Sequence, residues 1–154
     1  MRFMVIVKVT EVSENEVEMP DPQFMADMNK FNDELVKAGV LLAYDGLHPS
    51  SKGARVHFSG KNCTVTDGPF AETKELIAGY WLMQVKSRQE AIDWALRVPC
   101  PSDASQDGHI ELRQLFELSD FASSPAVDRC SALGEELAKR AKTSWHEICV
   151  RRQS

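Results

Sequence analysis

A nine-residue segment, DGPFAETKE at Asp67–Glu75, concentrates groups that can do acid–base chemistry. Carboxylates serve as general acids, general bases or metal ligands, and a lysine amine binds anionic groups. The alternative is a shaped loop, in which the Asp-Gly-Pro start makes a turn, Phe70 anchors the loop in the core and the charges form surface ion pairs. Both interpretations stay open, because loops on a rigid scaffold often carry function. The residues concerned are Asp67 and Glu72 as catalytic candidates and Lys74 and Glu75 as ligand-binding candidates.

A second set of polar residues follows a predicted strand at residues 40–44. His48 is a candidate general base, because the pKa of histidine lies near working pH. A solvated loop histidine is the alternative. Tyr44 and Asp45 end the same strand and are candidates for ligand binding.

Two opposite charges, Glu111 and Arg113, alternate with apolar residues in the last predicted strand. Residues two apart in a strand share one face of a sheet. If that face lines a cavity, both charges are partly buried and need partners. They would pair with each other, with Lys74 or with a polar ligand, and a purely structural ion pair is the alternative.

Composition and cysteine spacing exclude several classes of protein. The net charge of −5 argues against a nucleic-acid partner, and the sequence has no apolar run long enough for a membrane helix. The four cysteines form no C-x-x-C pair and no zinc pattern, and His146 and Cys149 are too few ligands for a metal site. We therefore expect no metal or cofactor. With no signal peptide recognisable, we expect reduced thiols and a cytoplasmic location.

The elements that position these residues follow from hydrophobic periodicity and capping signals. Alternating residues predict strands, apolar residues three and four apart predict helices, and Gly60-Lys61 predicts a hairpin turn. One helix begins at Asp21-Pro22 and ends at Gly39, and the other begins with a capping box at Ser87–Glu90. The predicted strands are 2–9, 40–44, 55–59, 62–66, 79–85 and 110–118.

The order β-α-β, β-hairpin, β-α-β is that of an α+β, ferredoxin-like split β-α-β sandwich with an inserted β-hairpin. Two helices cover one face of such a sheet, and the other face would expose Met4, Ile6 and Leu115. A homodimer would cover that face, since two-fold pairs are the commonest assemblies. We therefore predict a domain at 1–118, followed by a linker and helical extension at 119–154.

The nine-residue block is also the signature stretch of a known family. The chain resembles the DGPF subgroup of YCII-related proteins over about residues 1–118. Flanking segments that strengthen the resemblance are 38–42, 46–50, 78–81 and 108–113. The resemblance implies a ferredoxin-like fold of the dimeric α/β-barrel type.

What the resemblance implies about activity is limited. Some YCII relatives carry a His–Asp pair proposed as catalytic, with the His on the first helix. This sequence has Met25, Met28 and Asn29 there, and no histidine before His48. A signalling partner is also implied, since some family genes lie beside genes for extracytoplasmic-function sigma factors.

Three functional hypotheses remain open from the sequence. The first is a dimeric binder of a small polar or anionic molecule in a regulatory role, with its pocket between the sheet and the Asp67–Glu75 loop. The second is an enzyme that uses carboxylate and histidine acid–base chemistry on a small substrate. The third is a protein-interaction module that uses the dimer and the C-terminal helix.

Overall fold

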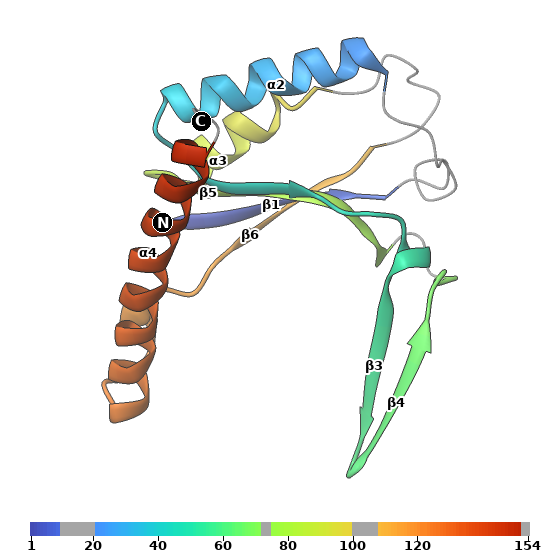
Figure 1. Ribbon diagram of the computed structural model, residues 1–154, viewed down its shortest axis with the longest axis vertical. Helices are drawn as coiled ribbons and strands as arrows, with labels where there is room; N and C mark the ends of the chain where they lie inside the picture. The colour runs from blue at the N-terminus through green and yellow to red at the C-terminus, as the bar shows by residue number, and fades with distance from the viewer. Residues whose placement is uncertain (10–20, 72–74, 100–107, 152–154) are drawn as a thin grey trace. The chain divides into compact units, whose positions relative to one another are not determined.

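The computed structural model describes residues 1–9, 21–71, 75–99 and 108–151, with residues 140–151 by their backbone only (Figure 1). The chain divides into two compact units, Met1–Leu115 and Phe116–Ser154.

The first unit is built on a four-stranded antiparallel sheet. In its order, β2-β5-β1-β6, strands β5 and β1 are central and strands β2 and β6 form the edges, as in the split β-α-β arrangement. This topology confirms the ferredoxin-like fold. The predicted hairpin is inserted in the chain between β2 and β5. The elements are β1 (Arg2–Lys8), α2 (Pro22–Lys37), β2 (Leu41–Gly46), η1 (Ser50–Lys52), β3 (Ala54–Ser59), β4 (Asn62–Asp67), β5 (Ile77–Gln84), α3 (Arg88–Ala95) and β6 (Ile110–Gln114).

The ends of α2 follow the predicted signals. Pro22 occupies the first turn, where its missing N–H costs no hydrogen bond. Asp21 is the N-cap residue, but its side chain makes no capping hydrogen bond. Gly39 follows the helix with a φ of 69°, a left-handed conformation that glycine adopts without strain. The helix can therefore end there and the chain can turn into β2.

The core lies between this sheet and the two helices. Val5 and Met83 from the sheet and Leu35 from α2 are fully buried. Phe31 of α2 meets the Trp81 ring edge-on, with 5.6 Å between ring centroids. The indole Nε1 of Trp81 donates a 2.8 Å hydrogen bond to Oδ1 of Asn32, so the buried amide oxygen and indole N–H satisfy each other.

Helix α3 begins with the expected Ser87 N-cap, but the return hydrogen bond of the predicted capping box reaches the residue before it. Ser87 Oγ accepts a hydrogen bond from the Glu90 amide at 3.1 Å, and the Glu90 carboxylate accepts one from the amide of Lys86 at 2.7 Å. The helix is short, but Ala91 is completely buried, and Trp94 packs against the core.

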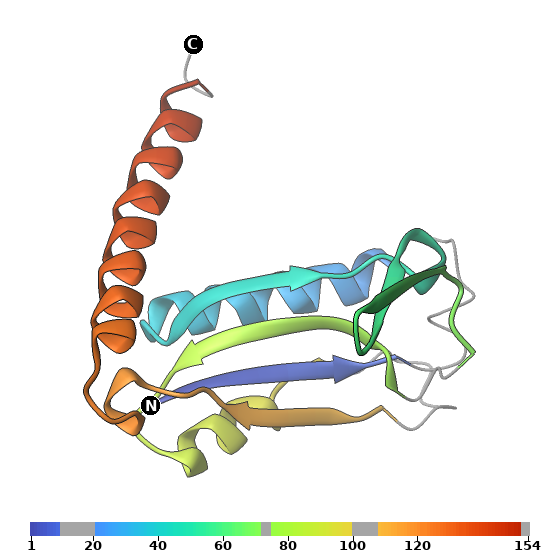
Figure 2. The same cartoon turned by 90° about the horizontal axis from the view of Figure 1, so that it is seen from below.

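The other face of the sheet carries no helix of this unit among the described residues. Figure 1 shows α2 and α3 on the same side of the strands, and Figure 2 looks onto the opposite side. The inserted hairpin is a separate two-stranded sheet. Figure 1 shows it extending from the strands on the side away from α2 and α3.

The second unit begins earlier than the predicted domain end. The strand predicted for 110–118 ends at Gln114, and one further backbone hydrogen bond joins the Leu115 amide to the Arg2 carbonyl at 2.9 Å. Phe116 falls within the predicted strand, but it lies beyond β6 and is exposed beside Phe121, with ring centroids 5.4 Å apart. The unit consists of η3 (Leu118–Asp120) and α4 (Pro125–Arg151).

Candidate functional site

The uncovered face of the sheet is organised in rows that cross all four strands. Residues directly opposite each other in antiparallel strands share one face, so the strand register defines these rows. Their centre is apolar or aromatic, and charged residues stand at the β6 end of both rows and at the β2 end of one. From β2 to β6, one row is Asp45, Tyr80, Ile6 and Glu111, and the next is Ala43, Leu82, Met4 and Arg113.

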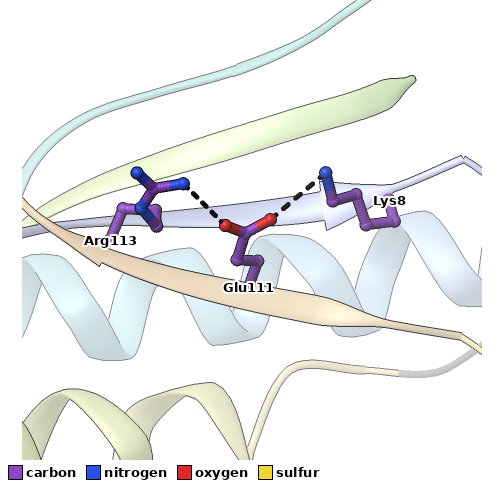
Figure 3. Close-up of polar contacts among 3 residues, drawn as sticks. All are labelled: Lys8, Glu111 and Arg113. Carbon is purple, nitrogen blue, oxygen red and sulfur yellow. Dashed lines mark hydrogen bonds and ion pairs between the residues drawn. The ribbon is translucent and has the colours of Figure 1, made fainter. Parts of the chain in front are cut away.

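A three-residue charge cluster occupies the β6 edge of this face (Figure 3). The Glu111 carboxylate lies 3.0 Å from Nη1 of Arg113 and 3.2 Å from Nζ of Lys8. The guanidinium of Arg113 and the ammonium of Lys8, each hydrogen-bonded to it, hold the pKa of Glu111 below its usual 4.5. Glu111 is therefore negatively charged at neutral pH and suits charge pairing better than proton donation.

The cluster has more positive than negative charge. Two cations share one carboxylate, in a chain whose overall net charge is −5. A lysine ammonium has three N–H donors and a guanidinium has five, whereas one bond from each goes to Glu111. This edge of the sheet can therefore attract and hydrogen-bond an anion.

The opposite edge of the face carries a weaker polar pair. The Tyr80 hydroxyl lies 3.4 Å from Oδ2 of Asp45, to which it donates a hydrogen bond. Tyr44 is opposite Trp81 in the register, so it belongs to the other face of the sheet. Of the two residues predicted together, only Asp45 shares a face with Glu111.

The start of the Asp67–Glu75 loop packs closely on the loop after β2. A Cβ on Gly68 would lie 1.8 Å from the backbone oxygen of Ser50, so only glycine fits there. The Phe70 amide donates a 3.0 Å hydrogen bond to Oγ of Ser50. The guanidinium carbon of Arg55 lies over the Phe70 ring, 4.1 Å from the ring centroid. In the shaped-loop interpretation Phe70 anchors the loop in the core, whereas in the structure its ring contacts Arg55 of the hairpin.

The end of this loop lies next to the charge cluster in the strand register. The amide of Val9 donates a 3.1 Å hydrogen bond to the carbonyl of Leu76, and Lys8 is opposite Ile77. Residue Glu75, at the end of the nine-residue block, directly precedes this pair and is exposed. The end of the loop and Lys8 therefore belong to the same end of the sheet, whereas Arg113, opposite Met4, lies further along the strands.

The remaining predicted residues are less closely grouped. Asp67 ends β4 opposite Ala54, and His48 precedes η1; both side chains are exposed. The predicted roles of Glu72 and Lys74 concern side chains outside the described residues. Within the part of the chain that the structure describes, no group of three or more His, Cys, Asp or Glu side chains is placed to hold a metal ion.

A shallow groove lies away from the predicted pocket, between α2 and the segment after α3. Its volume is about 310 Å³, and an ion pair between Glu34 and Arg97 joins two of its lining residues. Asp27, Lys30, Phe31 and Pro99 line the rest. The groove contains none of the predicted site residues.

Lys8 is the site residue that sequence reasoning missed. Alternation along the first strand puts Lys8 on the same face as Met4 and Ile6, which is a usable signal. Its nearness to Glu111 depends on the pairing of β1 with β6, and local sequence patterns do not specify that pairing.

These features define an α+β protein whose ferredoxin-like sheet has one face that no described helix of the same unit covers and a charged cluster at the edge of that face. The family model for the YCII-related domain matches residues 1–119, and the chain belongs to this family. It is also similar to an uncharacterised protein of Rhizobium meliloti (strain 1021), with 37% identity over 75 residues. That match covers 49% of this chain and 60% of the relative.

The part of the chain that the structure describes contains no helix both long and apolar enough to cross a membrane.

Proposed function

We propose that the protein is a homodimer that binds a small anionic molecule at the edge of its uncovered sheet face, near the Asp67–Glu75 loop. The excess positive charge of the Lys8–Glu111–Arg113 cluster on an otherwise apolar face is the observation that carries this proposal. It favours the ligand-binding hypothesis over the other two that the sequence leaves open.

Dimerisation is supported by the composition of the uncovered face. Its centre consists of Met4, Ile6, Tyr80 and Leu82, which are partly buried within one chain. Large apolar patches are rare on monomers and are normally covered by a partner. A second copy with the same patch supplies a self-complementary surface, as a two-fold dimer requires.

Ligand binding follows from what dimerisation does to the charges. A second copy would remove water from the sheet edge, and a charge that loses water needs a partner. Glu111 can neutralise only one of the two cations beside it, so Lys8 and Arg113 together keep one positive charge. A carboxylate or phosphate group would neutralise that charge, and guanidinium groups bind both in a bidentate manner.

The finer assignments belong to the same proposal. The nine-residue block supports membership of the DGPF subgroup, and the gene neighbourhoods of that family support a regulatory role with a signalling partner. The cysteine pattern, which predicts reduced thiols, supports a cytoplasmic location. Asp45, Glu75, His48 and Asp67 come from the same end of the chain's first unit and would line the rim of the ligand site. Residues 119–154 would form an extension outside the binding domain.

The ligand proposal is tested by calorimetry and thermal shift with phosphate, simple phosphate monoesters, and mono- and dicarboxylates. Lys8→Met and Arg113→Met each remove a charge-assisted hydrogen bond, which contributes about 1.5–3 kcal/mol, so each should weaken binding by about tenfold or more. Lys37→Met, on the last turn of α2, is the matched control and should bind like the unmodified protein.

Two results would contradict the proposal. One is that no anion in the panel raises the melting temperature of the unmodified protein, since a ligand of the native state must stabilise it. The other is that an anion binds equally well to Lys8→Met, Arg113→Met and Lys37→Met, which would place its site elsewhere.

A further inference from the structure

The β3–β4 hairpin has one largely apolar face and one polar face, although both faces are exposed in the single chain. Its register places two apolar pairs on one face, with Ala54 opposite Asp67 at the base of that face, and polar residues opposite polar residues on the other face. The apolar face contains Val56, Phe58, Cys63 and Val65, and the polar face contains Arg55, His57, Thr64 and Thr66.

The apolar face of the hairpin lies open in the single chain. Val56, Phe58 and Val65 are 52%, 72% and 67% exposed. The polar face contacts the chain's own loop, because the guanidinium of Arg55 stacks on the ring of Phe70. A two-stranded hairpin is only marginally stable by itself, so an apolar face of this kind is expected to pack against another surface.

The direction and length of the hairpin indicate where that surface lies. Figure 1 shows that the hairpin extends on the side of the sheet away from α2 and α3, which is the side of the uncovered face. Six-residue strands are about 20 Å long, whereas packed sheets are about 10 Å apart. A second copy seated on the uncovered face would therefore lie beside the hairpin along much of its length.

The area of the uncovered face supports the same conclusion. Four strands about 4.8 Å apart and about 20 Å long have a footprint of about 400 Å². A stable dimer buries about 800 Å² on each partner. A footprint is a projected area and understates the accessible surface of the side chains on it, but this face is small for a stable dimer, and the hairpin offers additional apolar surface next to it.

We propose that the apolar face of the β3–β4 hairpin packs against the second copy of the chain and acts as an arm that holds the dimer. This inference rests on the dimer of the proposed function and adds a second contact surface to it. The dimer then has one sheet-on-sheet contact that contains the two-fold axis, and two arm-on-partner contacts that the axis relates to each other.

The arm is tested by sedimentation equilibrium of the full chain and of variants on its two faces. Phe58→Asp and Val65→Asp place a charge in the proposed contact and should each raise the dimer dissociation constant by about tenfold or more. Thr64→Asp is the matched control on the polar face of the same strand, and its dissociation constant should equal that of the unmodified protein.

Cys63 provides a second measurement that does not depend on a charged variant. It lies opposite Phe58 on the apolar face and is exposed in the single chain. In a chain with Cys100→Ser, Cys130→Ser and Cys149→Ser, Cys63 should react with a thiol reagent about tenfold more slowly as a dimer than as a diluted monomer.

The outcomes separate the arm from the dimer itself. The arm would be overturned, and the sheet-face dimer left intact, if the unmodified chain is a dimer, Phe58→Asp and Thr64→Asp have the same dissociation constant, and Cys63 reacts at the monomer rate. An unmodified chain that is monomeric at every concentration would overturn the dimer of the proposed function, and the arm with it. Selective weakening by Phe58→Asp and Val65→Asp, with a protected Cys63, would support the arm.

Discussion

Replacing Gly68 by alanine tests how the Asp67–Glu75 loop is held at the site. The added Cβ would lie 1.8 Å from the backbone oxygen of Ser50 and 2.6 Å from its carbonyl carbon. The two backbones must separate by about 1.6 Å to restore ordinary contact, and overpacking of this kind costs about 1–3 kcal/mol. The same movement breaks the 3.0 Å hydrogen bond from Phe70 to Ser50, which contributes about 1 kcal/mol.

These two effects predict a loss of about 2–4 kcal/mol in the free energy of unfolding of the Gly68→Ala variant. For a chain of this length, that corresponds to a melting temperature lower by about 6–12 °C. Circular dichroism at fixed protein concentration measures the shift, and hydrogen exchange should show a faster-exchanging Phe70 amide.

Gly46→Ala is the matched control for this substitution. Gly46 lies in the adjacent segment, but a Cβ added to it would meet no atom within 4 Å, and its φ is not in the left-handed region. The melting temperature of this variant should equal or slightly exceed that of the unmodified chain, because alanine restricts the unfolded state. Equal melting temperatures for Gly68→Ala and Gly46→Ala would refute the reasoning.

Three further predictions concern the cluster and the core. Arg113 and Lys8 lower the folded-state pKa of Glu111, so the unmodified chain should be more stable than Glu111→Gln above about pH 5. This stability difference should vanish as the pH falls below 4.5 and through the folded-state pKa. Urea unfolding at several pH values measures the difference, and a difference that does not change with pH would contradict the prediction. Asn32→Ala leaves the buried indole N–H of Trp81 without its acceptor and should cost about 1–3 kcal/mol; an unchanged urea midpoint would argue against that bond. Ser87→Ala removes the N-cap of α3 and should cost about 1 kcal/mol in the same assay, with no loss expected if the cap is unimportant.

The fold was largely predictable because its signals are local. Pro22 and Gly39 set the ends of α2, Ser87 caps α3, and Gly60 turns the hairpin with a φ of 61°. Each of these residues acts through its own backbone conformation or a hydrogen bond to a near neighbour. The order of the elements then left few topologies for a four-stranded antiparallel sheet.

The site was only partly predictable because it depends on register. Alternation places Glu111 and Arg113 on one face, but the contact of Glu111 with Lys8 requires β1 and β6 to be paired. The ring of Phe70 contacts Arg55 because two loops and the hairpin meet, which no local pattern encodes. Long-range pairing thus separates what the sequence predicted from what it missed.

The central claim is that two copies pair through the uncovered sheet face, and sedimentation of the full chain tests it most directly. Leu82 lies at the apolar centre of that face, between Ala43 and Met4, so Leu82→Asp places a charge in the proposed interface. The account predicts that the unmodified chain is a dimer at micromolar concentration and that Leu82→Asp is a folded monomer. An unmodified chain that sediments as a well-folded monomer up to near-millimolar concentration would contradict it.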